Sequence, residues 1–155
     1  RTIDRKINIL DRKLNGKSIA ATEDSIVRGD TTKTIVQKLR NKGAKEVHIF
    51  VTFPRIIGPC FYGVDMATYS ELIGSTHSAE EIANIIGADT VNYQSIEGFV
   101  KATEFAKEDL CLGCITGQYP TPLAQKLADR MKERFLSGHK ETGRLYEIES
   151  EILSA

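Results

Sequence analysis

Two adjacent carboxylates, Glu23 and Asp24, follow a short apolar stretch and precede a loop that leads into a helical pattern. Residues 18–22 predict a buried strand, and residues 25–31 contain a single glycine before the helix begins. Carboxylates at the end of a strand can hold the vicinal hydroxyls of a ribose, directly or through Mg²⁺. Backbone N–H groups of a loop and of a helix N-terminus can receive a phosphate. The pattern therefore indicates either a site for a phosphorylated sugar or, without any ligand, an acidic strand end followed by an Asp-capped helix.

The elements around this segment predict an α/β fold. Residues 31–42 place apolar side chains on one helical face and stop at Gly43, and residues 46–53 alternate in the manner of a second strand. A right-handed crossover would make the two strands parallel neighbours, and open α/β sheets bind ligands beyond the carboxyl ends of their strands. Glu23 and Asp24 stand at such an end.

The rest of the chain predicts several helices and one more strand. Ser78 and Glu81 form a capping-box pattern that opens a helix closed by Gly87. The other elements that we expect are a short helix at 68–75, a strand at 90–93, helices at about 95–106 and 122–136, and one more helix in the tail from residue 143. We interpret residues 1–155 as one domain, with a core at about 18–106 and a C-terminal region of cysteines and helices at about 107–155.

Length and charge exclude several classes of function. A chain of 155 residues, 41% of them hydrophobic, has the size of one ordinary domain. Its 21 basic and 21 acidic residues leave no net charge that would attract nucleic acid or an anionic membrane. The apolar runs are far shorter than the roughly 20 residues that cross a bilayer, and no signal-type segment opens the chain. We therefore expect a cytoplasmic, soluble protein with no nucleic-acid or membrane partner.

The cysteines and histidines are the remaining residues that could do chemistry. Three cysteines cannot all pair with one another, and Cys111 and Cys114 are separated by only two residues. In an intracellular protein this spacing favours metal or redox chemistry over a disulfide framework. No nucleophile and orienting acid are recognisable near His48, His77 or His139, so we interpret the histidines as structural or surface residues.

The amino-acid identities in the loop indicate a family more specifically than the strand-loop-helix pattern does. Residues 23–29, together with Thr31, resemble the 5-phosphoribosyl-1-pyrophosphate (PRPP) signature of the amidophosphoribosyltransferases, in which two aspartates precede the same Ser-Ile-Val-Arg-Gly stretch. Further similar segments follow in the same order, so the resemblance runs from residue 6 to about residue 120: they are 5–8, 43–47, 59–66, 71–73, 85–89 and 111–120. The chain is thus similar to the C-terminal part of the phosphoribosyltransferase domain of that family.

This resemblance implies a type I phosphoribosyltransferase fold, here a partial, Rossmann-like parallel sheet with flanking helices and a C-terminal helical region. In the intact family enzyme, glutamine supplies ammonia that displaces pyrophosphate from PRPP to give 5-phosphoribosylamine, the first step of purine biosynthesis. The resemblance also implies that Glu23 and Asp24 hold the ribose hydroxyls and Mg²⁺, and that Lys6 reaches the pyrophosphate. The residues implied in the 5-phosphate cradle are Ser25, Ile26, Val27, Arg28, Gly29, Asp30 and Thr31. All are binding roles, with charge stabilisation at the departing pyrophosphate as the main catalytic device, and no residue is assigned as a catalytic group.

Two residues of the loop depart from the family pattern. Glu23 replaces the first aspartate and keeps its charge, whereas Asp30 replaces a threonine of the phosphate site. A carboxylate at about 4 Å from a phosphate costs roughly 1 kcal/mol in water and several times that in a drier site. Asp30 therefore either weakens the phosphate site or caps the helix while facing away from the ligand.

Several parts of the family enzyme precede the region that is similar here. The glutaminase cysteine, the pyrophosphate loop and the flexible closing loop are not recognisable in this chain. Without them we expect no glutamine hydrolysis and poor exclusion of water. We therefore expect a chain that is inactive alone and that associates with itself or with a polypeptide carrying the missing N-terminal, glutaminase half. The alternative is a non-catalytic PRPP- or nucleotide-binding paralogue or a regulatory subunit.

The three cysteines also take part in the resemblance. Cys60, Cys111 and Cys114 are similar to three of the four cysteines that hold a 4Fe–4S cluster in one branch of the family. The resemblance implies a cluster on these three thiolates with a fourth ligand from elsewhere, and thiolates suit iron–sulfur clusters or zinc. The other interpretation is that they are reduced cysteines left by ancestry.

Overall fold

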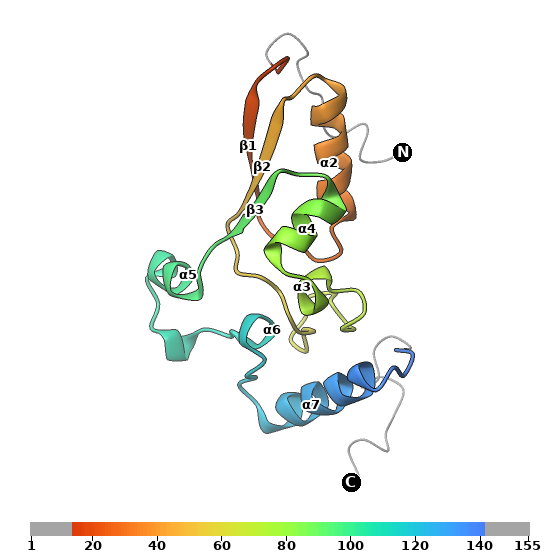
Figure 1. The fold of residues 1–155 in the computed structure, drawn as a ribbon. Helices are drawn as coiled ribbons and strands as arrows, with labels where there is room; N and C mark the ends of the chain where they lie inside the picture. The colour runs from red at the N-terminus through yellow and green to blue at the C-terminus, as the bar shows by residue number, and fades with distance from the viewer. Residues whose placement is uncertain (1–13, 142–155) are drawn as a thin grey trace.

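The structure is a computed structural model that describes residues 14–141. Figure 1 shows a sheet in the upper half of the view, with α5, α6 and α7 beyond its lower end. In chain order the elements are β1 (Ser18–Glu23), α2 (Asp30–Asn41), β2 (Glu46–Val51), α3 (Ile73–Thr76), α4 (Ala79–Ile86), β3 (Thr90–Tyr93), α5 (Ile96–Thr103), the 3-10 helix η2 (Lys107–Asp109), α6 (Gly113–Thr116) and α7 (Pro122–Leu136).

The three strands form a parallel sheet in the order β1-β2-β3. Every second residue of a strand faces the same side, so Val47, Ile49 and Val91 lie together in one buried cluster with apolar residues of α2 and α4. Both helices lie on the same side of the sheet (Figure 1). Each fully buried valine or isoleucine contributes about 1.5–3 kcal/mol to stability. This packing fixes the start of α2, and the loop before it, at the carboxyl end of β1.

The opposite face of the sheet carries exposed side chains. Ala20, Thr90 and Asn92 are exposed there, and Phe50 keeps 44% of its surface accessible. Parallel sheets are usually covered on both faces and therefore read as nearly continuous apolar runs. In β2 the side chains alternate instead, so one face of this sheet is apolar and the other is mixed. Such a pattern is typical of a sheet with only one covered face.

Tyr119 holds together the region beyond the carboxyl end of the sheet. Its ring is buried, and its hydroxyl donates a hydrogen bond to the carbonyl oxygen of Pro59 at 2.7 Å. Glycine is needed beside this ring, because a Cβ at Gly58 would lie 2.7 Å from the Tyr119 hydroxyl and one at Gly113 would lie 2.4 Å from a ring carbon. Tyr119 thereby fixes residues 58–60 against residues 111–114.

Most expected elements are confirmed. The three strands and the helix at 122–136 lie where they were expected, and the Ser78 and Glu81 capping box is formed, with Gly87 in the left-handed conformation at the helix end. Within residues 14–141, no helix is both long enough and apolar enough to span a bilayer. The tail helix expected from residue 143 lies outside the described residues.

Two expected helices are shorter in the structure. The helix expected at 68–75 is wrong over most of its length, because Leu72 adopts an extended conformation (φ −90°, ψ 103°) and the Ile73 N–H donates to the Val27 carbonyl oxygen, leaving only α3. The helix expected at 95–106 ends at Thr103, where Glu104 adopts a left-handed φ of 61°.

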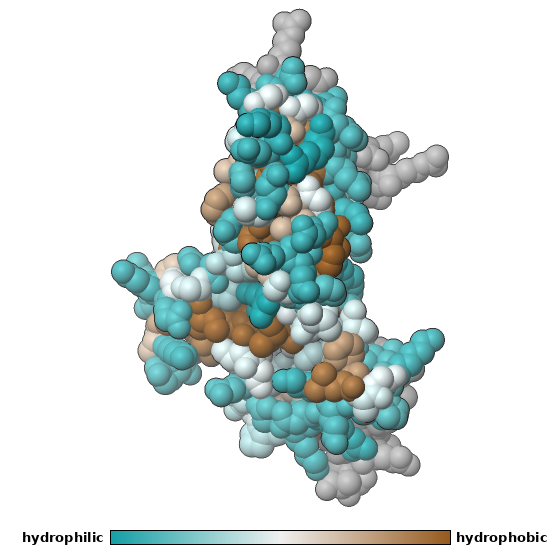
Figure 2. Space-filling view, viewed as in Figure 1, coloured by the Kyte–Doolittle hydropathy of each residue, from teal (hydrophilic) through white to brown (hydrophobic). Residues whose placement is uncertain are grey.

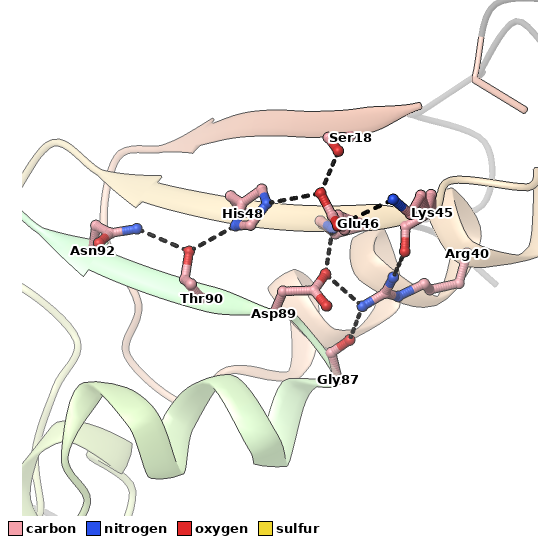
Figure 3. A network of polar contacts seen from close by, with 10 residues as sticks. Ser18, Arg40, Lys45, Glu46, His48, Gly87, Asp89, Thr90 and Asn92 are labelled. Atoms are coloured by element: carbon pink, nitrogen blue, oxygen red, sulfur yellow. Dashed lines mark hydrogen bonds and ion pairs between the residues drawn. The ribbon is translucent and has the colours of Figure 1, made fainter. Parts of the chain in front are cut away.

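Asp89 joins three elements at the amino-terminal edge of the sheet (Figure 3). Its Oδ2 accepts hydrogen bonds from Arg40 Nη2 at 2.7 Å and from the Val47 N–H at 2.5 Å. Its own N–H donates to the Val47 carbonyl oxygen at 2.8 Å. The Val47 N–H holds the pKa of Asp89 below its ordinary value, with Arg40 adding to the effect against a smaller opposing effect of burial.

We expect Asp89→Asn to lower the free energy of unfolding by about 1 kcal/mol, because an amide weakens two charge-assisted hydrogen bonds at a partly exposed site. A carboxyl group with a lowered folded-state pKa stabilises above its unfolded pKa and loses this effect as the pH falls through the folded value. The difference from the unsubstituted protein should therefore shrink below about pH 4. Urea unfolding at several pH values measures it, with the exposed Asp109→Asn as control; equal stabilities at neutral pH would contradict the role given to Asp89.

Candidate functional site

A pocket of about 290 Å³ lies at the carboxyl end of β1 and is lined by the continuous segment of residues 23–32. These include every loop residue singled out from the sequence, from Glu23 to Thr31. The segment runs from the strand end through the loop to the first turn of α2. Lys6, the residue expected at the pyrophosphate, lies outside the described residues.

The loop is held by burial of its ends and by one glycine. Ile26 and Thr32 are only 2% and 3% exposed. Gly29 is the N-cap of α2 with φ 86° and ψ −10°, a left-handed conformation in which residues other than glycine are strained. The first helical hydrogen bond runs from the Lys33 N–H to the Gly29 carbonyl oxygen at 2.8 Å. The N–H groups that precede it have no intrahelical acceptor, and their partial positive charge suits a phosphate.

The carboxylate pair at the end of β1 is fixed through its backbone. Thr52, just past the end of β2, donates its N–H to the Glu23 carbonyl oxygen at 2.9 Å, and its hydroxyl reaches the Glu23 and Asp24 carbonyl oxygens at 3.3 and 3.4 Å. The Asp24 carboxylate accepts the Ser25 N–H at 2.6 Å. Burial, and then the charge of Asp24, raise the pKa of Glu23. Two hard oxygen ligands that repel one another suit a divalent cation such as Mg²⁺, so the donor set fits this ion.

Asp30 is the first residue of α2 and not its cap. The N-cap position belongs to Gly29, so the interpretation of Asp30 as a helix cap is wrong. Asp30 is exposed and lines the pocket with the loop. Its charge is favourable to the helix dipole but unfavourable to a bound anion.

Arg28 does not stand alone in the loop. Its guanidinium forms a hydrogen-bonded ion pair with Glu71, which lies in the turn before α3. Neither Glu71 nor Thr52 was singled out as a site residue from the sequence. The contacts of Glu71 with Arg28 and of Thr52 with Glu23 join residues far apart in the chain, so no local sequence pattern predicts them. The one signal available for Thr52 was its position just after the end of a strand.

The three cysteines gather beside the loop. Cys60, Cys111 and Cys114 are free thiols that line one apolar pocket of about 440 Å³, which also touches Asp24 and Val27. Figure 2 shows apolar surface in the lower half of the view, where α5, α6 and the segments around them lie. Burial, followed by the charges of the other two thiols, raises the pKa of Cys114 to about 11.

These thiols do not by themselves complete a metal centre. Within residues 14–141, no three Cys, His, Asp or Glu side chains are arranged to hold a metal ion. The 4Fe–4S cluster implied by the resemblance is therefore not supported by the described residues. The histidines lie apart from both pockets; for example, His48 contacts the Thr90 hydroxyl at 3.0 Å on the exposed face of the sheet (Figure 3).

The relatives found by sequence and the solved structures found by fold agree with one another. No protein-family model matches the chain. It is 50% identical over 116 residues to the amidophosphoribosyltransferase of Methanocaldococcus jannaschii, covering 75% of this chain and 24% of that protein. It is 45% identical over 124 residues to the amidophosphoribosyltransferase of Bacillus subtilis, covering 77% of this chain and 26% of that protein. The solved glutamine PRPP amidotransferase from B. subtilis, complexed with ADP and GMP, matches with a TM-score of 0.67 at 43% identity, over 76% of this chain and 28% of that chain.

The parallel sheet and the loop at the carboxyl end of β1 thus define a partial type I phosphoribosyltransferase fold, as expected. Within that class, the chain is a homologue of part of the amidophosphoribosyltransferases, and the resemblance seen in the sequence is confirmed. The chain spans about a quarter of the length of these relatives.

Proposed function

We propose that this chain is the PRPP-binding part of an amidophosphoribosyltransferase, which makes 5-phosphoribosylamine from PRPP and glutamine. The observation that carries the proposal is the arrangement of the carboxylate pair and the phosphate-type loop around one pocket at the start of α2. The solved relative from B. subtilis is a complex with ADP and GMP, which supports a ligand with a phosphorylated ribose. The similarity to amidophosphoribosyltransferases supports this proposal over the alternative of a non-catalytic paralogue or a regulatory subunit.

Each group of residues has a distinct task in this proposal. Backbone N–H groups of residues 25–31 bind the 5-phosphate, because they are fixed donors at a helix N-terminus. Glu23 and Asp24 hold the ribose hydroxyls and would ligate Mg²⁺. When bound, this ion would neutralise the carboxylates and stabilise charge on the pyrophosphate. Within residues 14–141 we assign no catalytic nucleophile or general base, so we propose that turnover needs further parts of the family fold.

Asp30 gives a direct test of the site. We expect Asp30→Thr to tighten the binding of ribose 5-phosphate about fivefold, because the substitution removes a like-charge repulsion of roughly 1 kcal/mol. Calorimetry with Mg²⁺ present measures the affinity of both forms. Glu80→Thr is the matched control, since Glu80 is a first-turn carboxylate of α4 that does not line the pocket.

The outcomes of this experiment separate two questions. If neither form binds ribose 5-phosphate or PRPP at millimolar concentration, the proposed function is wrong. If both bind equally well, the site stands, but the Asp30 carboxylate faces away from the ligand and the charge argument fails.

A cluster at the cysteines forms a separate part of the proposal. Cys60, Cys111 and Cys114 share one pocket and are similar to cluster ligands of the family, but the described residues lack a complete site. We expect that any metal bound there is iron with a fourth ligand from elsewhere. Anaerobic purification followed by iron and sulfide analysis checks this, and Cys111→Ser should abolish the iron. Stoichiometric zinc without iron would contradict the assignment.

We also propose that the exposed face of the sheet packs against a second copy or against a polypeptide that carries the rest of the family fold. The exposed Phe50 on that face and the usual covering of parallel sheets support this. Sedimentation at micromolar concentration should show self-association of the purified chain, and Phe50→Ser should weaken it. A monodisperse monomer for the unsubstituted chain would count against self-association.

A further inference from the structure

Glu71 connects the phosphate loop to the turn before α3. One carboxylate oxygen, Oε1, accepts the N–H groups of Ala67 at 2.5 Å and Thr68 at 2.9 Å. The other oxygen, Oε2, accepts a hydrogen bond from Arg28 Nη2. The Glu71 side chain is 17% exposed, whereas that of Arg28 is 53% exposed. The acid is therefore the more strongly fixed partner of this ion pair.

The carboxylate has little freedom to turn away. Two backbone donors fix Oε1, and the Thr68 hydroxyl adds a longer contact at 3.3 Å. Burial alone would raise the pKa of Glu71, but the N–H groups of Thr68 and Ala67 and the Arg28 guanidinium together lower it, so the group is ionised at neutral pH. Oε2 is consequently held in one position as an acceptor for Arg28.

A second contact ties the same two segments together. The Ile73 N–H donates to the Val27 carbonyl oxygen at 2.9 Å. A Cβ at Gly29 would lie 3.3 Å from Ile73 Cδ1, so the loop backbone approaches this segment closely. Residues 67–73 thus contact the loop through one backbone bond, one apolar contact and one ion pair, and none of them lines the pocket.

We propose that Glu71 is a positioning residue for the phosphate loop and that Arg28 is its anchor and not a ligand of the phosphate. The proposal rests on the proposed function, because it concerns how that site is held. The Arg28 charge is already matched by Glu71, so recognition of the anion depends on the N–H groups of the loop. Those donors are effective only when the backbone is fixed.

The opposite assignment, in which Arg28 binds the phosphate directly, predicts the opposite sign. Glu71→Gln would then free a cation and remove a nearby negative charge, and both changes would tighten anion binding. If Glu71 positions the loop, the same substitution weakens binding although the site becomes less negative. Glutamine keeps a carbonyl oxygen for the Ala67 and Thr68 N–H groups, so the turn is retained while the Arg28 contact is lost.

Calorimetry of the full chain with ribose 5-phosphate and Mg²⁺ provides the first measurement. We expect Glu71→Gln to weaken binding roughly tenfold, the effect of one lost charge-assisted hydrogen bond. Glu81→Gln is the matched control, because Glu81 also accepts a backbone N–H, that of Ser78, but does not line the pocket. Unchanged or tighter binding by Glu71→Gln would overturn the proposal.

Amide hydrogen exchange provides a measurement that needs no ligand. We expect faster exchange at Ile73 and at residues 27–29 in Glu71→Gln than in the unsubstituted chain or Glu81→Gln. Arg28→Met tests the same link from the other side and leaves the turn contacts of Glu71 in place. Arg28→Met should weaken the binding of ribose 5-phosphate by the same factor as Glu71→Gln, and the double variant should bind no more weakly than either single variant. Unchanged amide exchange in Glu71→Gln would overturn the positioning role of Glu71. If the unsubstituted chain binds no ribose 5-phosphate, the proposed function fails, but the exchange measurement still decides whether Glu71 positions the loop.

Discussion

The N–H groups at the start of α2 are the constraint on which the site depends. They precede the first helical hydrogen bond, from Lys33 to Gly29, and so need acceptors from outside the helix. The structure brings them to one pocket by burying Ile26, by the left-handed turn at Gly29 and by packing α2 on the sheet. The parallel pairing of β1 with β2 then sets Glu23 and Thr52 side by side at the same end. A phosphate-type loop and a carboxylate pair therefore meet because one helix and one strand are placed by the same apolar core.

Local patterns were enough to predict the parts of this arrangement that are local in origin. Strand alternation placed β2, and the pair Ser78 and Glu81 placed the start of α4, because both patterns reflect hydrogen bonds or faces within a few residues. The helix expected at 68–75 failed because Leu72 is extended and the Ile73 N–H donates to the Val27 carbonyl oxygen, a contact with a distant segment that the local pattern does not mark. The Arg28 and Glu71 pair joins residues 43 apart in the chain, and no periodicity of the sequence marks such a contact. The same limit applies to Thr52, which reaches back to the previous strand.

The cysteine region shows how structure and ancestry give different information. The resemblance aligns three thiols with cluster ligands, and the fold does bring all three to one apolar pocket through the packing around Tyr119. Three thiols can line the same pocket without having the geometry that binds a metal, and the described residues do not have that geometry. Burial in this apolar pocket also raises the pKa of Cys114 to about 11, whereas a thiol must lose its proton to ligate a metal. The buried surroundings alone thus do not prepare a cluster site.

The charges around the loop explain why geometry matters more here than net attraction. Among the residues that the structure describes, the carboxylates of Glu23, Asp24 and Asp30 line the pocket, and its one arginine, Arg28, is paired with Glu71. A phosphate approaching this pocket alone would meet net repulsion, which fixed backbone dipoles worth about 0.3–1 kcal/mol each must offset. These dipoles add only when they point at one place, so a loop that moves loses them together. A site with so little favourable charge therefore depends on the contacts of residues 67–73 with the loop as much as on the residues that line the pocket.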